Sequence, residues 1–251
     1  CMALMMAGYI RRHPVYASAR LHFRQTHLEP ATAWYIFRLG LPVGLSIFFE
    51  VSIFAMIALL ISSLGPTVVA GHQVALNFTG LLFMIPLSLA LAVTIRVGHG
   101  RGRRDLEAVQ LASRCALLLT LMIGLIAGTL LFLLRHQVPW LYSHDPAVRA
   151  VATSLLLYAA LYQLSDAWQV TVSGTLRGFE DTTVPMFITL LAYWGIGLPV
   201  GYCLAMTNLL RPAMGPEGFW IGLLSGLTAA ALMLSVRLHF RLRLFAATAT
   251  R

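Results

Sequence analysis

An apolar run from Leu39 to Leu64, with one acid, Glu50, near its middle, constrains this chain more than any other feature. About 20 apolar residues, at 1.5 Å per residue, are enough to cross roughly 30 Å of hydrocarbon. A carboxylate at the centre of such a span costs on the order of 3 kcal/mol. The run therefore predicts a membrane-spanning helix in which Glu50 either lines a polar cavity or ion path, or is protonated and donates a hydrogen bond between helices.

The composition indicates that the rest of the chain also lies in a membrane. Hydrophobic residues make up 59% of its 251 residues and charged residues only 11%, which excludes an ordinary soluble domain and predicts an all-α, polytopic membrane protein. The net charge of +9 comes from arginines between the apolar runs and forms no basic patch interleaved with aromatics, so no nucleic-acid partner is expected. The sequence contains no lysine and therefore no P-loop lysine of an ATP-driven motor.

Turn-forming residues divide the chain into spans. Six are predicted, at about 39–64, 68–95, 111–134, 149–172, 184–206 and 216–236. Together they form a six-helix transmembrane lobe over 39–236. Residues 1–10, which begin with Cys instead of Met, are interpreted as the end of a truncated transmembrane helix. Residues 11–38 are predicted to be a linker at the membrane surface, and residues 237–251 a C-terminal tail.

Arginines outside the spans are distributed unequally between the two sides of the membrane. The linker, the 96–104 loop, the loop containing Arg177 and the tail hold fourteen, whereas the opposite loops hold two. The positive-inside rule therefore predicts a cytoplasmic linker and a cytoplasmic C-terminus. That arrangement requires an even number of spans between them, in agreement with six.

Small residues inside the spans are assigned to architecture. Gly124 and Gly128, four residues apart, predict close packing between helices in lipid. The three cysteines, Cys1, Cys115 and Cys203, do not form a disulfide framework and are expected to be buried, inert thiols.

A second acid, Asp166, lies deep in the fourth predicted span. Tyr162 precedes it by one helical turn and Gln169 follows by nearly one, so the three side chains share a helix face. With no basic residue predicted inside any span, Glu50 and Asp166 are expected either to be neutral or to be paired with a mobile cation. A cation-coupled carrier uses both of these states.

The second span adds further polar candidates near its non-cytoplasmic end. Gln73 and Asn77 are weak candidates for lining a substrate cavity, and His72 is weaker still, since a lone helical histidine is more often a hydrogen-bonding residue of the core. No histidine or cysteine spacing is typical of a metal site. No GxSxG or HExxH motif is present, so no enzymatic activity, catalytic residue or cofactor is expected.

Three segments, FFEVSIFAMIALLISSLG, VAGHQVALNFTGLLFMIPLSLALAVTIRVG and GTLRGFEDTTVPM, occur in this order and spacing. They resemble the C-terminal half of multidrug and toxic compound extrusion (MATE) transporters of the NorM-like branch. The resemblance covers essentially the whole chain.

The resemblance implies a function and a site. Such proteins are secondary active antiporters that exchange Na⁺ or H⁺ for cationic, often aromatic drugs. Glu50, Tyr162 and Asp166 occupy positions that contribute to a monovalent-cation site in the family. The chain would be one lobe of a twelve-helix transporter in a bacterial inner membrane, with the lipid bilayer, cationic drugs and a missing N-terminal lobe as partners.

Two other functions stay open. A lipid-linked sugar flippase of the same superfamily would need arginine in its cavity for anionic headgroups, and no predicted span contains one centrally. A non-transporting membrane scaffold or assembly subunit would need no buried acids. The sequence does not distinguish Na⁺ from H⁺ as the coupling ion, because carboxylates bind both.

Overall fold

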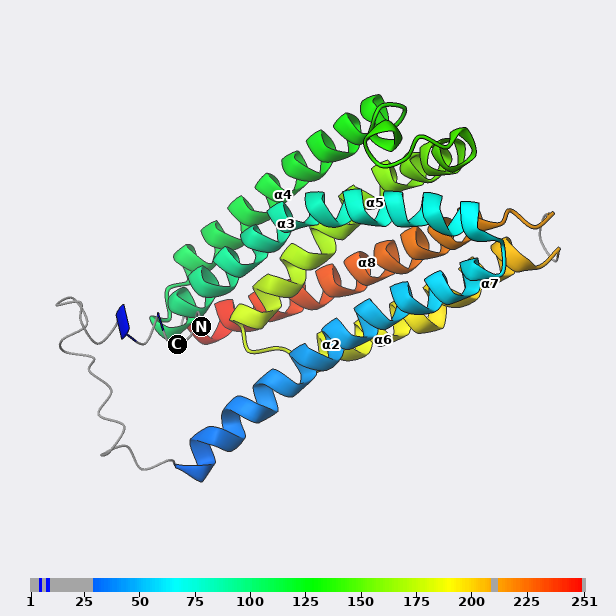
Figure 1. Cartoon of the computed structure of the whole chain (residues 1–251). Helices are drawn as coiled ribbons and strands as arrows, with labels where there is room; N and C mark the ends of the chain where they lie inside the picture. The colour runs from blue at the N-terminus through cyan, green and yellow to red at the C-terminus, as the bar shows by residue number, and fades with distance from the viewer. Residues whose placement is uncertain (1–4, 6–7, 10–28, 209–211, 250–251) are drawn as a thin grey trace. The chain divides into compact units, whose positions relative to one another are not determined.

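Helices make up most of the computed structural model, which describes residues 5, 8–9, 29–208 and 212–249 (Figure 1). They are α2 (Pro30–Ser62), α3 (Pro66–Gly102), α4 (Leu106–Leu134), α5 (Pro146–Gly178), α6 (Thr183–Leu190), α7 (Leu198–Met206) and α8 (Pro216–Ala249). A 3-10 helix, Val138–Leu141, precedes α5, and a π-helical segment, Leu191–Gly197, joins α6 to α7. This described part contains six helical segments long and apolar enough to cross a membrane, which confirms the predicted all-α, six-span architecture.

The chain divides into two compact units, residues 1–38 and residues 39–251, and the second unit is the helix bundle. The predicted helix end at 1–10 is described only at three helical residues, Met5, Gly8 and Tyr9. Residues 11–28 of the predicted linker lie outside the described residues. The cytoplasmic placement of the linker and tail stays a prediction.

Most helices extend beyond the predicted spans. Helix α2 begins at Pro30, within the predicted linker, and α8 continues through the predicted tail to Ala249. Hydropathy detects only the part of a helix that lies in hydrocarbon, whereas backbone hydrogen bonds continue the helix until a cap or breaker stops it. Asp105 is such a cap, because its side chain accepts a hydrogen bond from the backbone N–H of Ala108 at 2.9 Å.

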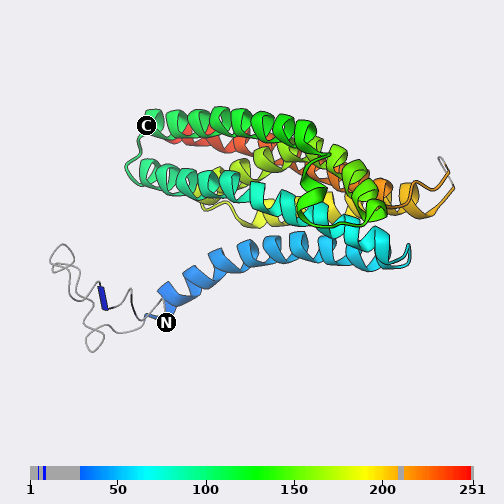
Figure 2. The same cartoon turned by 45° about the horizontal axis from the view of Figure 1, so that its top comes forward.

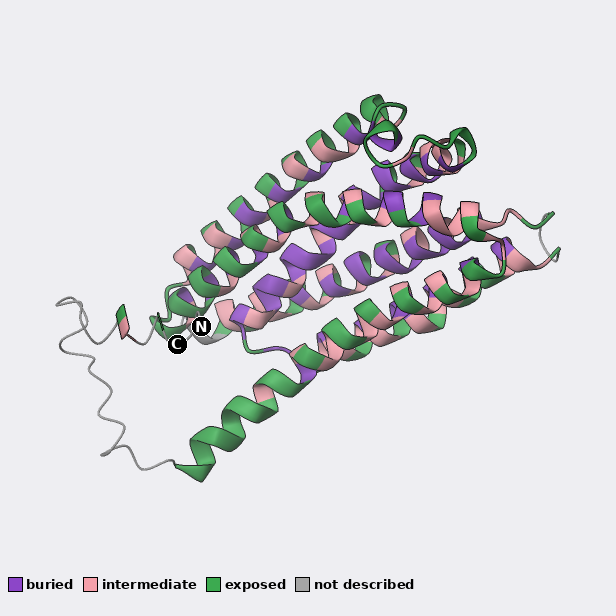
Figure 3. Ribbon diagram, viewed as in Figure 1, coloured by how far each residue is buried: buried purple, intermediate pink, exposed green. Residues whose placement is uncertain are grey.

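Helix α5 lies at the centre of the bundle, packs against α3, α4 and α8, and is buried over much of its length (Figure 3). Polar contacts, among them the following two, join it to its neighbours. The hydroxyls of Thr120 and Thr171 lie 2.7 Å apart, and Thr94 donates to the carbonyl oxygen of Gly174 at 2.7 Å. Hydrogen bonds of this kind stabilise helix pairs in lipid and fix their register.

Small residues bring α4 close to α5. A Cβ atom on Gly128 would lie 2.7 Å from the carbonyl oxygen of Ala160, and one on Gly124 would lie 3.2 Å from Leu164. A larger side chain at Gly128 would therefore push the helices apart. The predicted packing role of this glycine pair is confirmed.

The prediction of buried cysteines is wrong for the two that the structure describes. Cys115 is exposed on α4 and Cys203 is half-buried on α7. An apolar position in a span contacts either lipid or protein, and hydropathy alone does not distinguish the two surroundings. Cys1 lies outside the described residues.

The part of α2 that belongs to the bundle packs along a single stripe. Ile53, Ile57 and Ile61 recur every four residues and are fully buried in a core that also contains Tyr193 and Phe219. The rest of the helix from residue 39 to residue 62 is largely exposed or half-buried, and this part runs along one side of the bundle (Figures 2 and 3). The isoleucine face of α2 therefore anchors the helix to the bundle.

Ion pairs anchor the connection between α5 and α6. The carboxylate of Asp181, only 6% exposed, pairs with Arg237 at 2.7 Å and with Arg241 at 3.1 Å, both from α8. Beside it, Glu180 pairs with Arg101 of α3 at 2.9 Å. The loop that ends α5 is thus attached to two other helices.

Candidate functional site

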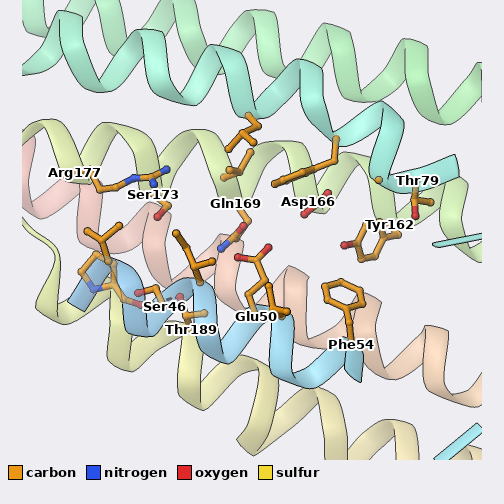
Figure 4. Close-up of a pocket in the computed structure, with 18 of the residues that line it drawn as sticks. Ser46, Glu50, Phe54, Thr79, Tyr162, Asp166, Gln169, Ser173, Arg177 and Thr189 are labelled. Carbon is orange, nitrogen blue, oxygen red and sulfur yellow. Dashed lines mark hydrogen bonds between the residues drawn. The ribbon is translucent and has the colours of Figure 1, made fainter. Parts of the chain in front are cut away.

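A cavity of about 400 Å³ opens between α2, α3, α5 and α6 within the bundle (Figure 4). Its walls combine apolar side chains, among them Phe54, Leu76, Phe83 and Leu87, with about as many polar ones. Apolar walls with convergent polar groups are the usual form of a small-molecule site.

Helix α5 supplies half of the polar residues in the wall. Tyr162, Asp166, Gln169, Ser173 and Arg177 all line the cavity. Their spacings of four, three, four and four residues keep them on one face of a helix with 3.6 residues per turn. We call this row the polar stripe of α5; it follows the length of the cavity in Figure 4.

Helix α2 brings Glu50 to the opposite wall. Ser46 and Phe54, one turn before and after it, line the same cavity. The indole N–H of Trp194, in the π-helical segment, donates to the carbonyl oxygen of Phe49 at 3.3 Å. This hydrogen bond fixes the backbone of α2 directly beside Glu50.

Several buried oxygens near the two acids have no hydrogen-bond partner among the described residues: Oδ1 of Asp166, Oε1 of Gln169 and the hydroxyl of Tyr193. An unsatisfied buried polar atom costs about 1–3 kcal/mol. Carboxylate, amide and hydroxyl oxygens are also the ligands that hard cations prefer. The arrangement can therefore accept hydrogen bonds from a cationic ligand or coordinate a small cation.

The structure brings together four of the seven predicted site residues, Glu50, Tyr162, Asp166 and Gln169. The other three, on α3, do not line the cavity. Their helix contributes Leu76, Thr79, Gly80, Phe83 and Leu87 instead.

Each of the three α3 residues has a different environment. His72 is buried and accepts a hydrogen bond at Nδ1 from the indole N–H of Trp220 at 3.2 Å. Gln73 and Asn77 are exposed, and the Asn77 amide donates to the carbonyl oxygen of Gln73 at 2.9 Å. His72 contacts the site indirectly, because Trp220 packs edge-on against the ring of Tyr162.

Sequence reasoning missed Arg177. The sequence pattern places it in a loop, but α5 continues to Gly178 and places this arginine in the cavity wall. Because Arg177 lies beyond the predicted end of the fourth span, the expectation that no basic residue lies inside a span stays a prediction. The helical spacing from Asp166 through Gln169 and Ser173 to Arg177 was the signal that could have identified it.

The family model described as MatE matches residues 42–203, which include both acids and the whole polar stripe. The chain belongs to the MatE family. Multidrug resistance protein PmpM of Pseudomonas aeruginosa is 47% identical to this MatE chain over 244 residues, which are 97% of the chain and 51% of the relative.

Two other matches extend the comparison. Probable multidrug resistance protein NorM of Shewanella oneidensis is 49% identical over 242 residues, 95% of this chain and 52% of the relative. An outward-facing structure of a multidrug resistance MATE family transporter shares the fold with a TM-score of 0.85 at 20% identity, over 97% of this MatE chain and 54% of that one. The chain spans about half the length of the relatives it matches.

Proposed function

We propose that this chain is the C-terminal lobe of a secondary active multidrug efflux transporter that exchanges Na⁺ or H⁺ for cationic, often aromatic compounds. The observation that carries the proposal is the position of Glu50 and Asp166 on facing walls of one cavity, beside buried oxygens that have no hydrogen-bond partner among the described residues. Relatives named as multidrug resistance proteins support it. The solved relatives are described as transporters, and we assign this chain no enzymatic activity and no cofactor.

The chemistry of the cavity suits a cationic aromatic ligand. Two carboxylates attract positive charge, and the charges of Glu50 and Asp166 act on each other. Phe54 and Phe83 provide apolar surface on which an aromatic ring can pack. A ligand with both features would bind across the acids.

Antiport then follows from mutual exclusion. Na⁺ or a proton occupies the acids in one state, and the cationic drug occupies them in the other. A membrane potential contributes ~2.3 kcal/mol per charge per 100 mV, which is enough to bias such an exchange. The bilayer and the other lobe of the transporter complete the site in this proposal, with the linker and C-terminus in the cytoplasm of a bacterial cell.

Neutralising either acid tests the proposal. Glu50→Gln and Asp166→Asn, each made in the protein expressed from its native gene, are expected to lower cation-driven ethidium efflux from cells at least tenfold, because the exchanged cation loses its counter-charge. Glu107→Gln, an exposed acid in the first turn of α4, is the matched control and should leave efflux unchanged. Equal membrane levels are checked by immunoblot, and wild-type efflux in both acid variants would contradict the proposal.

A lipid-linked sugar flippase is the second candidate, because Arg177 lines the cavity after all. It ranks lower because the two acids outnumber this arginine and repel an anionic headgroup. Retained efflux in both acid variants, combined with loss of lipid-linked sugar export in Arg177→Gln, would favour the flippase. If the protein were a non-transporting scaffold, none of the three variants would change efflux or lipid-linked sugar export.

A further inference from the structure

Three charged side chains line the cavity. Asp166 and Arg177 belong to the polar stripe of α5, and Figure 4 shows Glu50 on the facing helix, α2. Asp166 and Arg177 are eleven residues apart on α5, which corresponds to a rise of about 16 Å. The charge of Glu50 acts on both of the others.

The guanidinium of Arg177 has no hydrogen bond or ion pair with any residue that the structure describes, and its Nε is buried. The two acids that follow it in the chain already have arginine partners: Glu180 pairs with Arg101, and Asp181 pairs with α8. The loop acids beside Arg177 therefore do not neutralise its positive charge, which lies in the cavity wall.

The three charges determine how much positive charge the cavity accepts. With both acids ionised, Glu50, Asp166 and Arg177 sum to −1, and one monovalent cation neutralises them. Without the arginine the sum is −2, which one divalent cation or two monovalent cations would neutralise. Charges in a partly desolvated cavity interact far more strongly than in water, so one unit of charge changes this preference substantially.

We propose that Arg177 is a specificity-determining residue, which limits the cavity to a single monovalent cation by holding its net charge at −1. The inference rests on the proposed cation site at Glu50 and Asp166. It adds to that site a third charged group, one that repels divalent cations and a second monovalent cation.

The test measures binding in the purified, detergent-solubilised protein expressed from its native gene. Bound ethidium is followed by fluorescence anisotropy while CaCl₂ is added at constant ionic strength. In Arg177→Gln, half of the bound ethidium is expected to be displaced at a Ca²⁺ concentration at least about tenfold lower than in wild type. Removing the arginine makes the cavity more negative by one unit, and a divalent ion is attracted by that unit twice as strongly as a monovalent ion. Arg177→Lys keeps the charge and should behave as wild type. Arg101→Gln, which removes an arginine at the same end of the bundle outside the cavity, should also behave as wild type.

A charge-compensation pair keeps the inference testable if Arg177→Gln alone does not fold. Glu50→Gln leaves a net charge of zero and should weaken ethidium binding at least tenfold. Adding Arg177→Gln to this variant returns the charge to −1 and should restore most of the binding.

Three results would each overturn the inference and leave the proposed function standing. They are a calcium dependence in Arg177→Gln equal to that of wild type, a calcium sensitivity in Arg177→Lys equal to that of Arg177→Gln, and no recovery of ethidium binding in the double variant. Undiminished ethidium binding in Asp166→Asn would overturn the proposed function, and the inference with it.

Discussion

At the scale of single residues, Tyr162 combines two roles in the cavity. Its ring packs edge-on against Phe54 and Trp220, with centroids 6.5 and 6.0 Å away. Its hydroxyl belongs to the polar stripe, one turn from Asp166. The ring therefore shapes the wall, and the hydroxyl is available to a cation.

Tyr162→Phe separates these roles, because it keeps the ring and removes the oxygen. We expect cation-driven ethidium efflux to fall about three- to tenfold, the equivalent of one lost hydrogen bond or ligand of about 1 kcal/mol. Tyr158→Phe, one turn earlier on α5 and outside the cavity lining, should transport as wild type. Equal efflux by the two variants would show that the Tyr162 hydroxyl is not a ligand.

At the scale of helices, the π-helical segment Leu191–Gly197 positions α2. Single π-helical turns inside α-helices frequently mark functional sites. Here the segment carries Trp194, whose indole N–H holds the carbonyl of Phe49. Since the other contacts of α2 are mainly apolar, this hydrogen bond is a specific restraint on the backbone next to Glu50.

Trp194→Phe retains an aromatic ring and removes the donor. We expect the apparent KM for the coupling cation to rise about three- to tenfold, with maximal efflux nearly unchanged, because Glu50 is held less well in place. Trp168→Phe, which loses a 2.9 Å bond to Ser235 outside the cavity, is the matched control. It should lower thermal stability in detergent without changing KM, and an equal KM shift in both variants would contradict the positioning role of Trp194.

At the scale of the whole molecule, hydropathy and turn residues were enough to predict the bundle, because a bilayer tolerates few alternatives to apolar helices. The face shared by Tyr162, Asp166 and Gln169 was predictable from helical spacing alone. Arg177 was not, because a charged residue at a helix end looks the same in sequence whether it faces water or a cavity. The prediction that Gln73 lines the cavity does not hold for a related reason, because packing against α5 decides which face of α3 lies at the cavity.

The predicted orientation of the lobe can be tested by cysteine labelling. In a variant whose own cysteines are replaced by serine, Arg104→Cys between α3 and α4 should be shielded from a membrane-impermeant maleimide in spheroplasts, and His144→Cys between α4 and α5 should react. Permeabilised spheroplasts, in which both positions should be labelled, provide the control. Labelling of position 104 alone in intact spheroplasts would place the linker and C-terminus outside the cytoplasm.

The polar stripe lies on one uninterrupted helix, and this limits how the sequence can change in length. Inserting a single residue between Tyr162 and Ser173 would rotate everything beyond it by about 100°, turning part of the stripe away from the cavity and breaking the contact between Thr94 and Gly174. Relatives that keep the site should therefore vary in length in the loops around α5 and keep the count from Tyr162 to Arg177 constant.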